Sequence, residues 1–135
     1  MRQVGVVSVA VALAVGLLSA CGDDDNGGDV ASFCSAVDAL AADDPFAELA
    51  VASPQEMRAA FDELRDGVEA IARSAPDDVS GRADRYLDSV DELIDQLRGA
   101  GYDPRQLDTL RYGTATDAYE EAAVSIENAA QDACG

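Results

Sequence analysis

The chain has 135 residues with nine basic and 27 acidic side chains, which gives a formal net charge of −18 at pH 7. So large a negative surplus repels phosphate backbones and anionic head groups, and this excludes nucleic-acid binding as a function. The sequence contains no His, no Lys and no Trp. This composition excludes Ser-His-Asp triads, His-based zinc and di-iron centres and Schiff-base lysines, and a glycosidase-type carboxylate pair would lack a stacking tryptophan. We predict that the protein is not an enzyme and holds no cofactor and no metal.

The N-terminal segment begins with Met1 and Arg2 and continues with a mostly apolar run over residues 4–18. A short positive start followed by such a run is the layout of a secretory signal peptide. The run has about 15 residues, fewer than the roughly 20 that a membrane-spanning helix needs. We therefore predict a signal peptide over residues 1–20 that is cleaved, rather than a retained membrane anchor.

Four residues at the end of this segment, Leu18-Ser19-Ala20-Cys21, comprise an aliphatic residue, two small residues and a cysteine. They resemble the lipobox of bacterial lipoproteins. A thiol suits alkylation near neutral pH because its thiolate is a good nucleophile. The resemblance implies that Cys21 receives a diacylglycerol thioether and becomes the mature N-terminus after cleavage behind Ala20. An unmodified cysteine beside an ordinary cleavage site is the alternative.

The resemblance also implies a location. Two or three acyl chains hold a protein stably on a bilayer, so the folded part would lie on the extracytoplasmic face of the cell membrane. Removal of residues 1–20 leaves 8 arginines against 27 acidic residues, a net side-chain charge of −19. The absence of Lys is typical of high-GC coding, and together with the lipobox it makes the chain similar to small lipoproteins of actinobacteria.

The stretch that follows, residues 21–29 with the sequence CGDDDNGGD, is rich in Gly and Asp. That composition is typical of a flexible tether whose charges repel one another. Asp23, Asp25 and Gly28 also match positions 1, 3 and 6 of an EF-hand count, but position 12 is Cys34 instead of Glu. We therefore interpret the stretch as a tether and not as a calcium loop.

The rest of the chain, residues 30–135, is long enough for one domain. Ser53-Pro54-Gln55-Glu56 has the pattern of a capping box with proline at the first helical position, and apolar residues follow it at helical spacing. No stretch alternates with a period of two over the length of a strand. Gly99 and Gly101 are expected to end the third helix. We therefore predict an all-α fold, a small up-down bundle of about four main helices near residues 30–42, 54–74, 77–98 and 114–133, with a further helical turn over 104–112.

Two more cysteines lie near the two ends of this domain. Cys34 falls near the start of the first predicted helix and Cys134 just past the end of the last, and in an up-down-up-down bundle these points are at the same end. Secretion supplies an oxidising compartment. With Cys21 acylated, we predict a Cys34–Cys134 disulfide, and two free thiols are the alternative. The bond would close a loop of about 100 residues, which contributes on the order of 4 to 5 kcal/mol in the chain-entropy model.

Acidic side chains crowd the outward faces of the second and third predicted helices. The simplest interpretation is a solvated surface, partly neutralised by pairs four residues apart. The alternative is weak binding of divalent cations, which would also relieve the charge repulsion. The candidate ion pairs are Arg58–Asp62, Arg65–Glu69 and Asp78–Arg82, and the acids in question are Asp62, Asp66, Glu69, Asp84, Asp88, Asp91, Glu92 and Asp95.

A loop over residues 99–113 carries side chains of the types that dominate protein interfaces. The candidates for partner binding are Tyr102, Arg105, Arg111 and Tyr112. In the alternative interpretation, the tyrosines cap the end of the bundle. We expect the protein to act as a binding or adaptor module for a protein partner in the cell envelope.

The last predicted helix is rich in alanine, and this favours a second function, that of a carrier. Small side chains could leave a groove between helices for a lipid or another apolar ligand, or they could simply let the helices pack closely. An apolar cavity would favour the ligand, whereas a filled core with an exposed Tyr and Arg patch would favour the partner.

Overall fold

The computed structural model describes residues 28–43 and 52–135, and all structural statements refer to these residues. They form four α-helices and one short 3-10 helix, and they contain no strand. The predicted signal peptide and the lipidation residue Cys21 lie outside the described residues. The elements in chain order are α1 (Val30–Ala42), α2 (Pro54–Ser74), α3 (Asp77–Gly99), η2 (Pro104–Gln106) and α4 (Thr109–Cys134).

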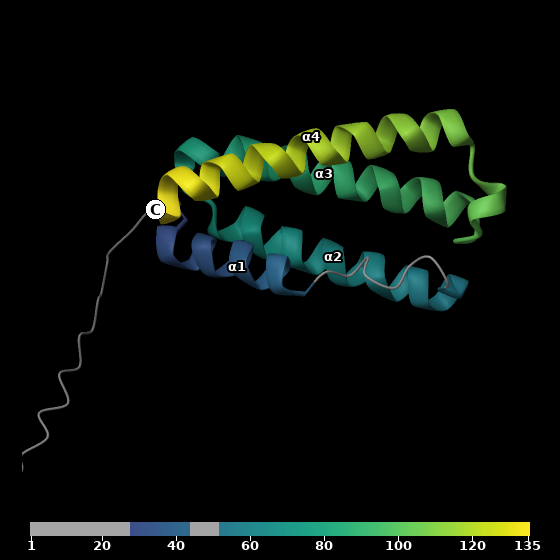
Figure 1. Cartoon of the computed structure of the whole chain (residues 1–135), viewed down its shortest axis with the longest axis horizontal. Helices are drawn as coiled ribbons and strands as arrows, with labels where there is room; N and C mark the ends of the chain where they lie inside the picture. The colour runs from purple at the N-terminus through teal and green to yellow at the C-terminus, as the bar shows by residue number, and fades with distance from the viewer. Residues whose placement is uncertain (1–27, 44–51) are drawn as a thin grey trace, which may run out of the picture.

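The helices form an up-down-up-down bundle (Figure 1), so the predicted all-α fold is confirmed. Each helix packs mainly on the helices next to it around the bundle, in the order α1, α2, α3, α4 and back to α1. The helix α1 has 13 residues and α4 has 26. As a result α1 runs beside only that part of the bundle which contains the C-terminus of the chain (Figure 1).

Side-chain caps fix where α1 and α2 begin. The Ser53 hydroxyl accepts a hydrogen bond from the amide of Glu56 at 3.3 Å, and the Glu56 carboxylate accepts one from the amide of Ser53 at 2.7 Å, which confirms the predicted capping box. The Asp29 carboxylate accepts hydrogen bonds from the amides of Ala31 and Ser32 and so caps α1. Both predicted helix starts, at residues 30 and 54, therefore have a local cause.

The start of the fourth helix was predicted wrongly. The helix α4 begins at Thr109 and not near residue 114, because the Asp108 carboxylate accepts hydrogen bonds at 3.1 Å from the amides of Leu110 and Arg111. The predicted turn over 104–112 is accordingly divided between η2 and the first turn of α4. Gly113 lies inside the helix and does not interrupt it.

The end of α3 turns the chain sharply. The amide of Gly101 donates to the carbonyl of Arg98 at 3.0 Å and the amide of Tyr102 donates to that of Leu97 at 2.8 Å, which is the Schellman pattern. Gly101 has a φ of +61° and Tyr102 has a φ of +58°. The left-handed turn directs Tyr102 back onto the bundle, where it is 8% exposed.

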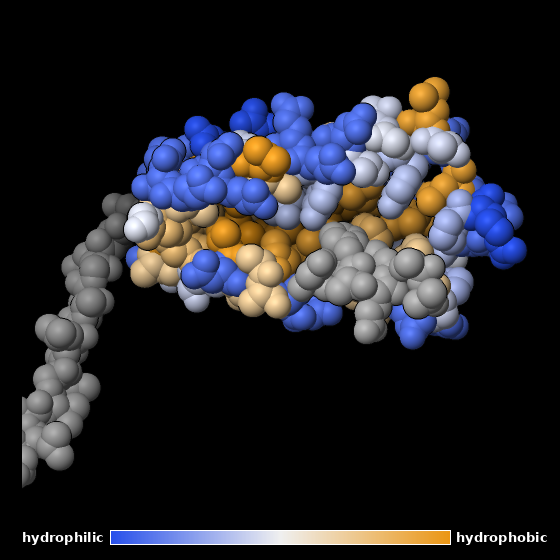
Figure 2. Space-filling model, in the orientation of Figure 1, coloured by the Kyte–Doolittle hydropathy of each residue, from blue (hydrophilic) through white to orange (hydrophobic). Residues whose placement is uncertain are grey.

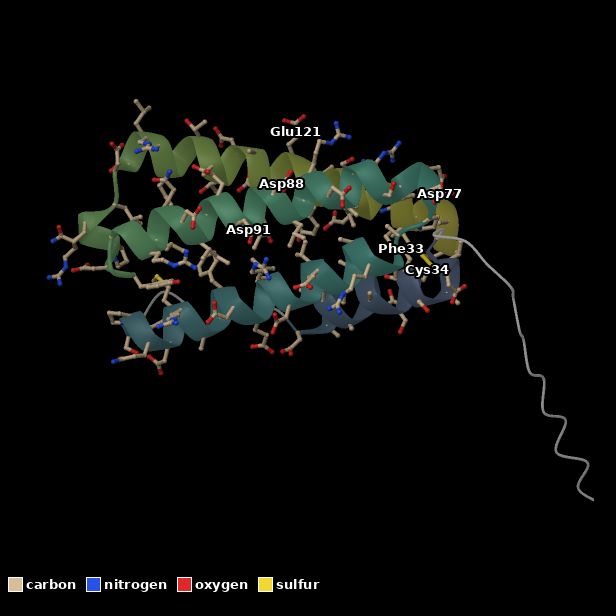
Figure 3. All side chains as sticks on the ribbon, turned by 180° about the vertical axis from the view of Figure 1, so that it is seen from behind. Phe33, Cys34, Asp77, Asp88, Asp91 and Glu121 are labelled. Carbon is tan, nitrogen blue, oxygen red and sulfur yellow. A yellow bond between two sulfur atoms is a disulfide. The ribbon has the colours of Figure 1, made fainter. Side chains whose placement is uncertain are left out.

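A disulfide joins the start of α1 to the end of α4, as predicted (Figure 3). The Cα atoms of Cys34 and Cys134 are 5.8 Å apart, and the bond closes a sequence separation of 100 residues. Phe33, the neighbour of Cys34, is fully buried and is the largest side chain that α1 places in the core. The α1 helix is therefore held at its first turn by one covalent bond and one aromatic ring.

Candidate ligand-binding groove

A recess of about 340 Å³ lies between α1 and α4, and we call it the α1–α4 groove. Its floor is formed by α2 and α3, and its walls by α1 and α4. Figure 2 shows it as an apolar, recessed strip between the polar surface of α4 and the surface of α1. The lining residues are Val37, Leu40 and Ala41 on α1, Leu64 and Ile71 on α2, Tyr86 on α3, and Tyr119, Ala123, Ile126 and Glu127 on α4.

The groove exists partly because its α4 wall carries a small side chain, Ala123, between two larger ones. On α4 the residues Tyr119, Ala123 and Glu127 are spaced by four and share one face of the helix. The methyl group of Ala123 fills little of the space between the helices. On the other wall, Leu40 packs against the backbone of Gly67 on α2, where an added Cβ would lie 2.8 Å from the Leu40 Cδ1 atom. Leu40 thus packs closely on α2 and also lines the groove.

Two tyrosine hydroxyls meet in the groove. The hydroxyl oxygens of Tyr86 and Tyr119 are 3.4 Å apart, and the ring centroids are 5.5 Å apart. Tyr86 is 5% exposed. Burial raises the pKa of Tyr86 well above its ordinary value, and the hydrogen bond to Tyr119 and the negative charge of Glu127 raise it further. The Tyr86 hydroxyl therefore keeps its proton at neutral pH, and the two hydroxyls form a polar point inside an otherwise apolar recess.

The charge around the groove is negative. Glu127 is the one acidic residue in the lining, and no arginine is among the lining residues that the structure describes. Between residues 109 and 134 the wall helix α4 carries five acids and a single arginine, which lies in its first turn. An apolar recess with few convergent polar groups is the usual form of a small-molecule site, and here the electrostatic environment disfavours anions.

The four residues predicted to bind a partner do not form one exposed patch. Tyr102 belongs to the core, as the capping interpretation requires, and Tyr112 is half-buried. Arg105 is exposed and its guanidinium pairs with the Asp103 carboxylate at 3.1 Å, while Arg111 is exposed. All four lie at the end of the bundle opposite to the disulfide (Figure 1).

The sequence analysis missed an exposed hydrophobic residue at this same end. Leu110 is 81% exposed on the first turn of α4. The sequence pattern predicts a separate turn over residues 104–112, and this prediction does not place Leu110 on the long helix. The helix cap at Asp108 was the sequence signal that could have placed Leu110 on α4 and outside its apolar face.

The acidic helix faces are solvated, as the simplest interpretation predicts. The predicted pairs Arg58–Asp62 and Arg65–Glu69 are present at 3.8 and 3.1 Å, whereas the predicted Asp78–Arg82 pair is not among the ion pairs of the described residues. Side chains such as Asp88 and Glu121 project from the outer surface (Figure 3). In the described part of the chain no group of three or more acids, cysteines or histidines is placed to hold a metal ion.

One ion pair that the sequence analysis did not predict joins α2 to α3. The Arg65 Nε atom lies 2.7 Å from the Asp91 carboxylate, and this contact is the main cause of a raised Arg65 pKa. Arg65 thus bridges Glu69 on its own helix and Asp91 on the next (Figure 3 labels Asp91).

Comparison with protein-family models, with curated proteins and with solved structures finds no match for this chain. Among the described helices, none combines the length and the apolar character that crossing a bilayer requires.

Proposed function

We propose that this protein is a lipid-anchored binding module on the extracytoplasmic face of the cell membrane, and that its α1–α4 groove takes up an apolar small molecule. The observation that carries the proposal is the recess of about 340 Å³ with two tyrosine hydroxyls inside it. Its volume falls within the range of small-molecule sites, roughly 300 to 1,000 Å³. We favour the ligand over the protein partner because Tyr102 is part of the core, which removes one of the four predicted contact residues.

The lipobox-like residues 18–21 support the anchor. The first described helix starts at Val30, at the end of the bundle where α4 stops (Figure 1). An anchor at Cys21 would therefore attach to the disulfide end and leave the other end of the bundle farthest from the lipid. Cys21→Ser should move the protein from the membrane fraction to the soluble fraction of the cell envelope. Unchanged retention in the membrane would contradict the anchor.

Uptake of an apolar molecule can be tested with the neutral fluorescent probe N-phenyl-1-naphthylamine. The Cys21→Ser protein is the suitable sample, because neither bilayer nor detergent then competes for the probe. We expect saturable binding with enhanced fluorescence. Ala123→Phe places a ring in the groove and should lower probe affinity at least tenfold.

Ala118→Phe is the matched control, since Ala118 is exposed on α4 and does not line the groove. It should bind the probe as the parent protein does, and circular dichroism should show that both variants remain helical. Equal affinity of the two variants, or no saturable binding by the parent, would contradict the proposal.

A protein partner at the far end of the bundle is a second candidate function, favoured by the 81% exposure of Leu110 beside the exposed Arg111. An aliphatic side chain and an arginine on one helix turn would suit an acidic partner surface with an apolar centre. If a protein co-purifies with the native lipoprotein, Leu110→Asp should abolish its recovery. If the co-purifying protein is recovered equally with Leu110→Asp, the surface around Leu110 is excluded as its binding site.

A further inference from the structure

The charged residues around the α1–α4 groove also indicate the charge of its ligand. We propose that it selects a cationic amphiphile, an apolar chain that bears a protonated amine, over uncharged and anionic molecules of the same length. This inference rests on the proposed function and names the ligand class for the same groove.

The first argument is the position of Glu127. This residue follows Ile126, which is 2% exposed and forms part of the apolar wall, yet Glu127 itself is exposed. Its carboxylate is therefore at the rim, where the recess meets solvent. An apolar chain in the recess would bring a polar head group to this rim, and a carboxylate there favours an ammonium group.

The second argument is that the influence of Glu127 reaches the floor of the groove. Glu127, Tyr86 and Tyr119 line the same recess, and the charge of Glu127 contributes to the raised pKa of Tyr86, a residue that is 5% exposed. One bound molecule can therefore lie against both the carboxylate and the phenol pair. The hydroxyls of Tyr86 and Tyr119 pair with each other inside the recess, so an apolar chain can lie beside them while the ammonium group lies at Glu127.

The third argument is the distribution of charge over the two walls. The described part of α1 contains one acid, Asp38, and no basic residue, and α4 contains five acids and one arginine. That arginine, Arg111, lies in the first turn of α4, at the end of the bundle away from α1. A fatty acid would meet repulsion along its whole approach, and an alkylamine would be attracted.

Three ligands with one chain length separate the possibilities: decylamine and decanoate, used below their micelle concentrations, and decanol, used below its solubility limit. Each would compete with N-phenyl-1-naphthylamine for the Cys21→Ser protein at pH 7. We expect decylamine to displace the probe at a concentration about three- to fivefold lower than decanol, which is the size of an exposed ion pair. Decanoate should be the weakest competitor. Added salt should reduce the differences between the displacement concentrations of the three ligands, because it screens the charges.

Glu127→Gln should remove most of the preference for decylamine, so that the displacement concentrations of decylamine and decanol differ by less than about twofold. Glu120→Gln removes the same charge from an exposed position on α4 that does not line the groove, and it should preserve the preference for the amine. Equal displacement by decylamine and decanol in the parent protein would overturn the inference and leave the proposed function standing. If Glu127→Gln and Glu120→Gln reduce the preference for decylamine over decanol equally, Glu127 is excluded as the binding position of the ammonium group. If the probe itself does not bind, the proposed function fails first.

Discussion

The α2–α3 hairpin and the α1–α4 pair are closed in different ways. The two long helices of the hairpin pack through bulky side chains such as Val68, Ile71, Val90 and Leu97, each at most 1% exposed, and Arg65 bridges to Asp91 between them. The α1–α4 pair has one fully buried large side chain, Phe33, and a disulfide. Bulky apolar side chains close the α2–α3 hairpin, whereas Phe33 and the disulfide hold the α1–α4 pair, which borders the recess.

This difference separates stability from binding. A groove needs unfilled apolar space, and unfilled space forfeits dispersion contacts and hydrophobic burial. In this molecule the hairpin supplies most of the packed core, and the disulfide compensates for the weak packing of α1 on α4. Substitutions in the hairpin should therefore change stability, and substitutions in the α1–α4 pair should change ligand affinity more than stability.

Reduction of the disulfide should have the largest effect. It opens a loop with a sequence separation of 100 residues, and the chain-entropy model gives a loss on the order of 4 to 5 kcal/mol for a loop of that size. Urea unfolding with and without reductant measures the loss. A double variant, Cys34→Ala with Cys134→Ala, should have the same urea midpoint as the reduced protein. Its midpoint should not change when reductant is added. An unchanged midpoint on reduction would mean that packing alone closes the α1–α4 pair.

Two substitutions of the same kind compare the regions directly. Leu97 on α3 is 1% exposed, and Leu97→Ala should cost about 2 to 5 kcal/mol of unfolding free energy. Leu40 on α1 is half-buried beside an open recess, so Leu40→Ala creates no enclosed cavity and should cost no more than the lower end of that range. Urea midpoints of the two variants give the comparison. Equal losses would show that α1 is packed as tightly as the hairpin.

The hairpin could be predicted from the sequence because its signals are local. The capping box at Ser53, the bulky stripes and the glycines at 99 and 101 all act within a few residues. The Cys34–Cys134 bond could be predicted because only the ends of an up-down bundle needed to be known. These features do not depend on the distances between the packed helices.

The remaining features depend on tertiary placement. The start of α4 was missed because its apolar stripe begins near Ala115, while the cap that starts the helix is at Asp108. The sequence alone does not decide between an exposed and a capping Tyr102, because its burial results from two successive residues with positive φ. The alanines of α4 do not by themselves predict the groove, since alanine is compatible with both close packing and a recess until the distance between α1 and α4 is known.

Two glycine substitutions test how closely α1 packs against the α2–α3 hairpin. Gly81 on α3 has no atom within 4 Å of an added Cβ, so Gly81→Ala should raise stability by about 0.5 to 1 kcal/mol through helix propensity. At Gly67 the same propensity gain is opposed, because the new methyl group must displace Leu40. We expect little net change in the urea midpoint of Gly67→Ala and weaker binding of the fluorescent probe, since Leu40 moves toward the groove. If Gly67→Ala gains as much stability as Gly81→Ala and binds the probe unchanged, the position of Leu40 does not depend on the absence of a side chain at Gly67.

Acid should act on the caps of α1 and α2, and this is the smallest expected effect. Hydrogen bonds from Ser32 and Ala31 hold the pKa of Asp29 below its ordinary 3.8, and those from Ser53 hold the pKa of Glu56 below its ordinary 4.5. Because both folded-state values are lowered, each cap contributes fully above the ordinary value, and its contribution is lost as the pH falls through the lower one.

The amide NMR signals of Ser32 and Ser53 would report the two titrations. Asp29→Asn and Glu56→Gln keep the hydrogen-bond acceptors and should remove the respective pH dependence. We expect the first turn of α1 to fray in acid more than that of α2, because α1 has 13 residues against 21 and fewer buried contacts beyond its first turn. Titration midpoints at or above the ordinary values would show that neither cap favours the ionised carboxylate. Equal fraying of the two helices would show that the disulfide next to Phe33 holds the start of α1 without help from its cap.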